Sequence, residues 1–225
     1  MANTERYRDR TDAGRQLAAL LGRYAHRPDV RVLALPRGGV PVAFVVAEAL
    51  RAPLDVFLIR KLGVPGQEEL AMGAIASGDV LVLNEDVIRS LSIPHAVIER
   101  VAAEEGRELQ RRERAYRDDR PPADVRGRTV IVVDDGLATG SSMRAAARAL
   151  RRQQPARLVL AVPVGAPDTC VELRAEVDEV VCGRIPASFI AIGFWYDDFS
   201  QTTDEEVREL LRRARRPPPI AAGTR

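Results

Sequence analysis

Residues 129–153 constrain the fold of this chain more than any other stretch. The run Thr-Val-Ile-Val-Val at 129–133 is apolar or β-branched and predicts a buried strand of a parallel sheet. Two carboxylates, Asp134 and Asp135, end the strand, and residues 141–153 predict a helix rich in Ala, Arg and Leu. Strands and helices alternate in this way along the chain, which predicts an α/β fold with a mainly parallel central sheet flanked by helices. Ligands of such sheets bind at the carboxyl ends of strands, where the acidic pair lies.

The loop between this strand and this helix has the chemistry of a phosphate site. It reads Gly136-Leu-Ala-Thr-Gly140, followed by Ser141, and its small residues allow several backbone N–H groups to converge on one point at the positive end of the helix dipole. The preceding carboxylates suit ribose hydroxyls or Mg²⁺. No lysine follows Gly140, which excludes a P-loop, and the glycine spacing excludes the dinucleotide fingerprint. The segment therefore predicts a site for a phosphorylated sugar.

This order of apolar strand, acidic pair, small loop and Thr-Gly-Ser resembles the phosphoribosyl-diphosphate (PRPP) signature of type I phosphoribosyltransferases. The resemblance implies that Asp134 and Asp135 hold the ribose hydroxyls of PRPP, directly or through Mg²⁺. It also implies that the loop binds the 5′-phosphate, a role that falls to Gly136, Leu137, Ala138, Thr139, Gly140 and Ser141. The alternative is a strand–turn–helix junction with ordinary capping, but that alternative does not explain why the three features occur together in this order.

A second strand–glycine loop–helix junction lies nearer the N-terminus. Residues 31–35 predict a buried strand, and an apolar helix ending at Leu50 follows the sequence Pro36-Arg37-Gly38-Gly39. Taken alone, the Gly-Gly pair is explained equally well by a tight turn. Beside the first loop it resembles the pyrophosphate loop of the same family. This resemblance implies that Arg37, Gly38 and Gly39 bind pyrophosphate next to a second Mg²⁺, and that the Pro36–Arg37 peptide bond is cis.

Lys61 is the one lysine in a chain with 34 basic residues, and it follows a predicted strand at 55–60. The glycine-rich stretch 62–79 comes next and predicts a lid or a disordered tip, because a long insertion of this kind inside a compact domain is usually functional or disordered. The resemblance places a flexible catalytic loop here. We therefore expect Lys61 and residues 62–79 to close over the site.

Five of the ten aromatic residues lie between 189 and 199. A hydrophobic flap is one explanation, but the pattern Ile-Pro-x-x-Phe, then Ile-Gly-Phe-x-x-Asp, also resembles the hood of 6-oxopurine phosphoribosyltransferases. The resemblance implies that Phe189 or Trp195 stacks on a base and that Asp197 contacts the base and helps to hold Mg²⁺. The chain departs from those enzymes at Ala138, where they have an aspartate, and at 162–165, where they have a purine-reading lysine. The acceptor base therefore stays open.

The whole chain, 1–225, is predicted to form a single domain with the type I phosphoribosyltransferase fold, with a small hood and a helical insertion. The core spans about 28–183, the hood spans about 184–203 before a C-terminal helix, and the charged helical insertion spans about 94–120. Acidic and basic side chains interleave in the insertion, which favours a solvated face over an RNA-binding one. Residues 1–10 are predicted to fray, a helix is expected to start at Thr11-Asp12, and the tail 217–225 is predicted to be disordered.

Composition excludes several other classes of protein. A formal net charge of +2 gives no nucleic-acid footprint, and no apolar run is long enough for a membrane span or a signal peptide. Cys170 and Cys182 have no metal or redox spacing, which predicts a reduced, cytoplasmic protein. The oligomeric state stays open, with a homodimer among the options.

The function implied by the resemblance is the Mg²⁺-dependent transfer of 5-phosphoribosyl from PRPP to a nitrogenous base, purine-like or otherwise heteroaromatic, with release of pyrophosphate. The catalytic roles fall to Asp134, Asp135, Lys61 and Arg37. The alternative is a non-catalytic PRPP-sensing regulator with the same fold. Lys61, Arg37 and the predicted lid favour the enzyme.

Overall fold

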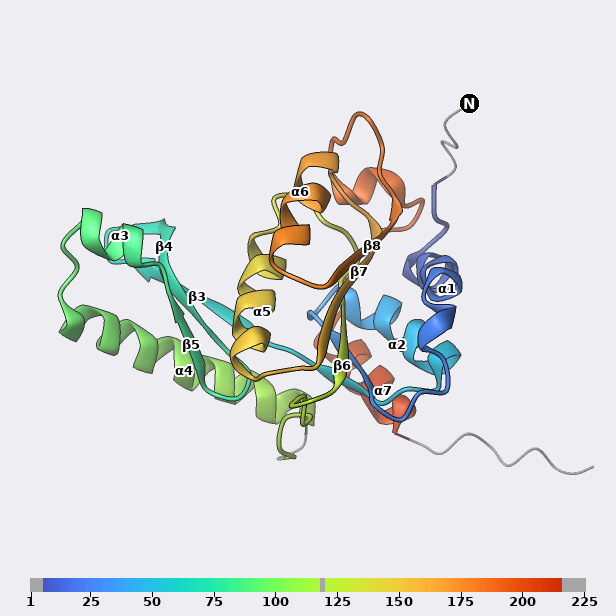
Figure 1. Cartoon of the computed structure of the whole chain (residues 1–225), viewed down its shortest axis with the longest axis horizontal. Coiled ribbons are helices and arrows are strands. Elements are labelled where there is room, and N and C mark those ends of the chain that lie inside the picture. The colour runs from blue at the N-terminus through green and yellow to red at the C-terminus, as the bar shows by residue number, and fades with distance from the viewer. Residues whose placement is uncertain (1–5, 118–119, 216–225) are drawn as a thin grey trace, which may run out of the picture.

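The computed structural model describes residues 6–117 and 120–215, and its core is a five-stranded parallel sheet (Figure 1). The strand order is β2-β1-β6-β7-β8. Strand β6 is the central strand and is buried along its whole length, as its run of β-branched residues predicts. It pairs in parallel with β1, with Ala34 opposite Val133, so that the loops after these two strands lie side by side. The strands are β1 (Val30–Ala34), β2 (Leu54–Val56), β6 (Thr129–Val133), β7 (Arg157–Val164) and β8 (Glu179–Arg184).

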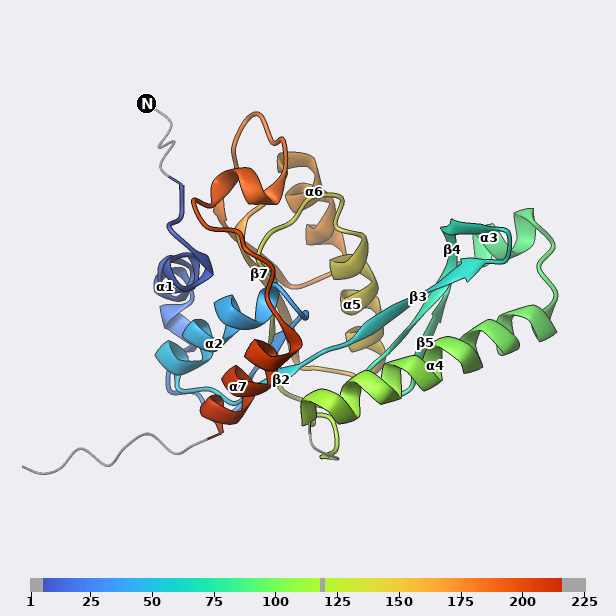
Figure 2. The ribbon, with the colours of Figure 1, turned by 180° about the vertical axis from the view of Figure 1, so that it is seen from behind.

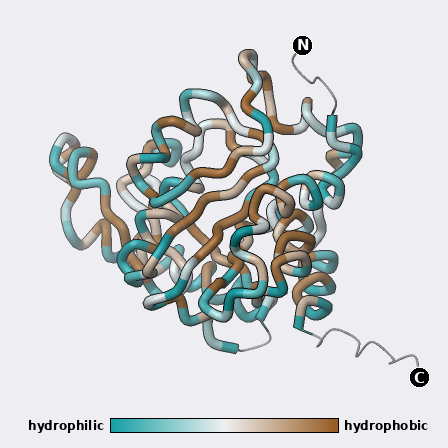
Figure 3. Tube along the Cα trace, turned by 45° about the vertical axis from the view of Figure 1, so that its right-hand side comes forward, coloured by the Kyte–Doolittle hydropathy of each residue, from teal (hydrophilic) through white to brown (hydrophobic). Residues whose placement is uncertain are grey.

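Helices cover both faces of this sheet (Figures 1 and 2). One face packs against α1 (Arg10–Leu20), α2 (Gly39–Leu50) and α7 (Asp204–Ala214). The other packs against α5 (Ser141–Arg152) and α6 (Pro167–Glu172). Alternate residues of each strand enter the two cores, as the strand period of two requires: Val32 and Ile131 face α2, while Leu33 and Val132 face α5. Figure 3 shows the hydrophobic residues gathered along these strands. The predicted α/β fold is confirmed.

An arm projects from the core in both views (Figures 1 and 2). It is an antiparallel sheet of β3 (Ile59–Val64), β4 (Gln67–Ala76) and β5 (Val80–Leu83), with α3 (Glu85–Ser90) and the long helix α4 (His95–Arg117). Ile98 and Leu109 of α4 are buried with Leu62 and Met72 of the sheet. The insertion helix therefore has a buried face and is an integral part of the arm.

The irregular, glycine-rich loop predicted for residues 62–79 is wrong, because this segment forms most of the arm sheet, while its closing over the site stays a prediction. Its glycines allow close strand pairing: a methyl group on Gly73 would lie 2.5 Å from the carbonyl oxygen of Val82 on β5. The predicted single strand 55–60 is also wrong, because it divides into β2 and β3 where the chain leaves the core for the arm.

The N-terminal prediction needs correction as well. Residues 6–10 are ordered and do not fray: the Tyr7 amide donates to the Trp195 carbonyl at 2.8 Å, and the Asp197 amide donates to the Tyr7 carbonyl at 2.8 Å. Helix α1 is capped by Asp9, whose side chain accepts from the Asp12 amide, so it starts before the predicted Thr11-Asp12 cap. The predicted tail 217–225 lies outside the described residues.

Shorter elements complete the chain. In the part of the chain that the structure describes, the short 3₁₀ helices are η1 (Gly22–Tyr24), η2 (Leu173–Ala175) and η3 (Ile192–Trp195). Within residues 6–117 and 120–215, no helix is both long and apolar enough to cross a membrane.

Candidate functional site

The two predicted glycine loops meet at the carboxyl ends of β1 and β6. A methyl group on Gly38 would lie 2.0 Å from Asp135 Oδ2, and one on Gly39 would lie 2.9 Å from Asp134 Cα. Only glycine allows the first loop to approach the acidic pair this closely. The Pro36–Arg37 peptide bond is cis, as predicted. The structure thus joins in one site the two motifs that the sequence separates by about a hundred residues.

The loop after β6 is anchored from one side. The Leu137 amide donates to the Val164 carbonyl at 2.9 Å, and the Leu137 carbonyl accepts from the Ala166 amide at 2.8 Å. The Thr169 hydroxyl on α6 donates to the Ala138 carbonyl at 2.7 Å. These bonds tie the loop to β7 and α6, so its shape is set before any ligand binds.

Most of the backbone amides of this loop have no acceptor within the described part of the chain. Leu137 is the exception, because its amide is used for anchoring. Helix α5 begins directly after Gly140, whose φ of 73° is a left-handed value suited to glycine, and its first N–H groups have no partner inside the helix. An anion would satisfy these donors, which are the amides of Gly136, Ala138, Thr139, Gly140 and Ser141.

Asp135 is buried, Asp134 is partly buried, and the pair is poor in compensating charge. Burial, together with the neighbouring charge of Asp135, raises the pKa of Asp134 well above its usual value. Burial also raises the pKa of Asp135, against the opposing effect of the Arg10 guanidinium. Within the described residues Asp134 makes no ion pair, and its Oδ1 accepts only from the Asp135 amide at 2.9 Å. The pair can therefore still bind hydroxyl donors or a cation.

Arg10 is a site residue that the sequence analysis missed. Its Nε and Nη2 donate to Asp135 Oδ2 at 2.9 and 2.8 Å, and its Nη1 donates to the Ser200 carbonyl at 2.7 Å. Its guanidinium lies 4.0 Å from the centre of the Phe199 ring, and its side chain is 11% exposed. Arg10 therefore connects α1, the acidic pair and the segment after η3. It is one of many arginines and lies 125 residues from its partner, so no local pattern marks it.

Two tyrosines hold the backbone around the acidic pair. The Tyr196 hydroxyl donates to the Asp135 carbonyl at 2.6 Å, and the Tyr7 hydroxyl donates to the Pro163 carbonyl at 2.8 Å. Burial raises the pKa of both hydroxyls, so they remain neutral donors. The two rings are 5.5 Å apart. The predicted hood is therefore joined to the N-terminal segment by both backbone and side chains.

The residues predicted to contact a base have different environments. Trp195 is 7% exposed and packs with Tyr7 in a small hydrophobic cluster, so its ring serves packing and offers no open face for a base. Phe189 is only partly buried at the edge of this cluster. Asp197 is exposed. Of the predicted stacking pair, Phe189 is the one whose ring is accessible.

The donor set fits Mg²⁺ bound mainly through substrate. Asp134 and Asp135 are adjacent hard oxygen ligands, and Mg²⁺ in phosphate sites commonly uses one or two carboxylates together with substrate oxygens and water. No three His, Cys, Asp or Glu side chains of residues 6–117 and 120–215 gather into a metal site. The role of Asp197 in holding Mg²⁺ stays a prediction.

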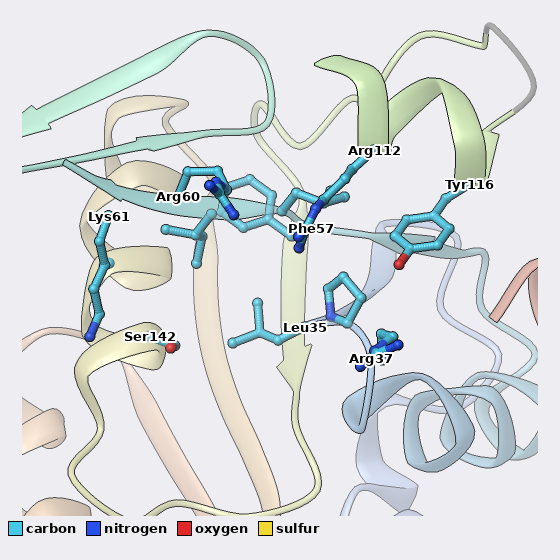
Figure 4. A pocket seen from close by; sticks show the side chains of 12 residues that line it. Leu35, Arg37, Phe57, Arg60, Lys61, Arg112, Tyr116 and Ser142 are labelled. Carbon is cyan, nitrogen blue, oxygen red and sulfur yellow. The ribbon is translucent and has the colours of Figure 1, made fainter. Parts of the chain in front are cut away.

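Lys61 and Arg37 line the same cavity of about 110 Å³ (Figure 4). Lys61 lies on β3 and its side chain extends toward the first turn of α5, where Ser142 also lines the cavity. Arg37 Nη1 lies 4.0 Å from Asp204 Oδ1 at the start of α7. The structure thus brings the predicted pyrophosphate-loop arginine and the lone lysine together, although the lysine lies on a strand and not in a loop.

Comparison with known proteins agrees with this geometry. The model of the phosphoribosyl transferase domain matches residues 74–198, which include the acidic pair and the loop after β6. The chain belongs to the phosphoribosyl transferase family. A Mycobacterium tuberculosis H37Rv relative of this family, named "Putative phosphoribosyl transferase Rv0571c", is 48% identical over 208 residues. The match covers 92% of this chain and 47% of that relative, so the chain spans about half the length of the curated relatives it matches.

A solved structure shows the same architecture. The crystal structure of TT1426 from Thermus thermophilus superposes with a TM-score of 0.82 at 43% sequence identity, over 92% of this chain and 98% of that one. The similarity thus extends to nearly the whole length of both chains.

Proposed function

We propose that this chain transfers the 5-phosphoribosyl group of PRPP to a nitrogenous base, purine-like or otherwise heteroaromatic, and releases pyrophosphate in a Mg²⁺-dependent reaction. One observation carries the proposal: the acidic pair, the loop with unpaired amides and the Arg37-Gly-Gly loop share one site at adjacent strand ends. Each part matches one part of PRPP. The chain is proposed to work as a single domain, with residues 184–203 as its hood.

The binding roles follow from the donors and acceptors that are free. The amides of the loop after β6 and the positive end of α5 take the 5′-phosphate. Asp134 and the second oxygen of Asp135 accept the ribose hydroxyls or hold Mg²⁺. Arg37 and the Gly38 amide face the pyrophosphate, whereas the Gly39 amide already donates to the Leu35 carbonyl at 3.1 Å and contributes by its close packing. Arg10 fixes Asp135 through its other oxygen, so that carboxylate stays in place.

The chemistry requires stabilisation of charge that develops as the C1′–pyrophosphate bond breaks. The base nitrogen forms a new bond to C1′, which becomes oxocarbenium-like while the leaving pyrophosphate gains negative charge. Arg37 and Lys61 are cations on the pyrophosphate side, and fixed charges placed where charge develops act strongly in a site closed to water. When bound, Mg²⁺ supplies further charge compensation for the pyrophosphate.

The base is proposed to lie under the hood, between Phe189 and Asp197. Helix η3 of the hood covers the loop, because a methyl group on Gly136 would lie 2.5 Å from Ile192 Cγ2. Phe189 offers a partly open ring, and stacking on one ring typically contributes on the order of 1–3 kcal/mol. Ala138 carries no acid beside the leaving base and residues 162–165 carry no lysine, so we do not assign hypoxanthine or guanine.

The decisive test combines binding with turnover. Calorimetry with PRPP and Mg²⁺ should show binding to the wild type and none to Asp134→Asn/Asp135→Asn, which is nearly isosteric. Asp86→Asn, an exposed aspartate on α3, is the matched control and should bind like the wild type. A screen of free bases with PRPP, detecting released pyrophosphate, then identifies the acceptor. Equal PRPP affinity in wild type and double variant would exclude the assignment, while binding without turnover on any base would indicate a PRPP sensor.

A further inference from the structure

The cavity beside the pyrophosphate loop is completed by the insertion helix α4 (Figure 4). Its walls come from the Pro36–Arg37 loop, the start of β3, the first turn of α5 and the C-terminal half of α4. Helix α4 contributes Arg112 and Tyr116, neither of which has a role in the binding scheme above.

The lining carries four cations and no carboxylate: Arg37, Arg60, Lys61 and Arg112. Two of them have close acidic partners on α4, since Arg60 pairs with Glu105 at 2.5 Å and Arg112 with Glu108 at 2.9 Å. Arg37 has only a 4.0 Å contact to Asp204, and Lys61 makes no ion pair with any described residue. The cavity therefore has excess positive charge, and its apolar walls lower the local dielectric and strengthen attraction for an anion.

Helix α4 is fixed to the core at this end, so Arg112 has a defined position. The Tyr116 hydroxyl donates to Asp204 Oδ1 at 2.6 Å, and burial with this bond raises the pKa of Tyr116 to about 12. Arg117 is buried and pairs with Asp55 of β2 at 3.0 Å. Arg112 lies one turn before these anchors, so the core fixes the position of its backbone beside the cavity, while its guanidinium pairs with Glu108 on the same helix.

The size of the cavity limits its occupant. At about 110 Å³ it is well below the roughly 300–1,000 Å³ typical of pockets for drug-sized ligands. This space suits one or two phosphoryl groups better than a base with its ribose. The cavity is lined by Arg37 of the pyrophosphate loop and by Lys61, so the expected occupant is the part of PRPP that leaves.

We propose that Arg112 is a further pyrophosphate-binding residue, supplied by the insertion helix. The inference rests on the proposed function and deepens it, because it extends the pyrophosphate site from the Arg37 loop to the arm. The ligand class is a diphosphate anion, either the pyrophosphoryl group of PRPP or inorganic pyrophosphate. Lys61 and Arg37 lie on opposite sides of the cavity in Figure 4, and Arg112 extends toward it from α4, so that the anion would lie among the three cations.

Calorimetry with inorganic pyrophosphate and Mg²⁺, and separately with PRPP and Mg²⁺, tests this proposal on Arg112→Gln. The matched control is Arg111→Gln: Arg111 pairs with the same Glu108 at 2.7 Å, is 69% exposed and does not line the cavity. Arg112→Gln should weaken pyrophosphate binding about tenfold or more, as expected for loss of a charge-assisted contact, and Arg111→Gln by less than about twofold. Arg112→Lys should recover part of the affinity, which shows that charge and not folding is responsible.

The outcomes separate this inference from the proposed function. Equal affinities in Arg112→Gln and Arg111→Gln, with PRPP bound by both, overturn the role of Arg112 and leave the proposed function standing. A second outcome is that the wild type does not bind PRPP, while pyrophosphate binding is lost in Arg112→Gln and kept in Arg111→Gln. This outcome supports the anion site and overturns the proposed function. A wild type that binds neither ligand overturns both. An equal loss of orthophosphate affinity would reduce the site to one phosphoryl group and contradict the diphosphate assignment.

Discussion

Replacing Arg10 with methionine would remove the guanidinium that holds the acidic pair while keeping an unbranched side chain over Phe199. In the structure, Asp135 Oδ2 accepts two hydrogen bonds from Arg10 and Asp135 is 8% exposed. The variant would therefore leave a buried carboxylate without its cationic partner. The Ser200 carbonyl would also lose its donor, although it can be reached by water because Ser200 is exposed.

The size of the effect can be bounded from two sides. Removing one partner of a buried ion pair typically costs about 3–5 kcal/mol. The cost has a ceiling, because the orphaned carboxyl can be protonated. Protonating a carboxyl of ordinary pKa, about 3.9, at pH 7 costs roughly 4 kcal/mol at 1.36 kcal/mol for each unit of pH above that pKa. We therefore expect Arg10→Met to lower the free energy of unfolding by about 3 kcal/mol at pH 7, and by less at pH 5, where protonation of Asp135 is easier.

A double-mutant cycle in urea isolates this pair. Unfolding of wild type, Arg10→Met, Asp135→Asn and the double variant should give a coupling of about 2 kcal/mol, because the asparagine removes the charge that Arg10 neutralises. Arg8→Met is the matched control. Arg8 lies one position before the cap of the same helix, is 74% exposed and pairs with Asp12, so its loss should change the free energy of unfolding far less than the loss of Arg10. A coupling below about 0.5 kcal/mol, or equal losses in Arg10→Met and Arg8→Met, would refute the reasoning.

Three further predictions concern the same site. Asp134→Asn should raise the melting temperature of the free protein at pH 7, because burial raises the pKa of the Asp134 carboxyl and disfavours its charged form. The neutral carboxyl is tolerated in acid, and this contribution to stability is lost as pH rises through the folded pKa, so the gain in melting temperature from asparagine should vanish near pH 4. A gain that stays constant with pH would contradict this cause. Gly38→Ala should lower the free energy of unfolding by about 1–3 kcal/mol and weaken PRPP binding, because the new methyl group would overlap Asp135 Oδ2. The control Gly22→Ala should change neither quantity, because no atom lies within 4 Å of its new methyl group. Lys61→Met should lower kcat far more than PRPP affinity, because the charge of Lys61 is needed as pyrophosphate departs. Equal losses of kcat and of PRPP affinity would mean that Lys61 binds PRPP in the ground state and does not act specifically in the transition state.

The parts of the fold that could be predicted are those whose determinants are local in sequence. A buried parallel strand is a continuous apolar run, and the glycine loop with its helix follows directly, so β6, the acidic pair and α5 could be read from one stretch. The same holds for β1 and α2. The meeting of their loops then follows from the parallel pairing of β1 with β6, because the carboxyl ends of neighbouring parallel strands share one edge.

The arm could not be predicted in this way. Glycine and small residues at 62–79 are typical of loops, but in an antiparallel sheet they also allow close strand approach, as Gly73 does beside Val82. Cross-strand pairing involves residues that are distant in sequence, so local composition cannot distinguish the two cases. Arg112 could not be predicted for the same reason. Its neighbours on α4 alternate in charge as on a solvated face, and only the docking of α4 beside Asp55 and Asp204 places that residue next to the site.

The N-terminal segment shows which kind of residue carries the missing information. Its charges suggest a solvated strand of chain, yet Tyr7 is 1% exposed and forms a parallel bridge with Tyr196. The free energy gained by packing one buried aromatic ring can exceed the conformational entropy lost when a short polar segment becomes ordered, so Tyr7 can dock the segment. Arg10 lies three residues further on, where α1 begins, and docking carries it to Asp135. An aromatic residue isolated in a polar terminus is therefore the signal to search for, because it can bring charged neighbours into a site that their own pattern does not predict.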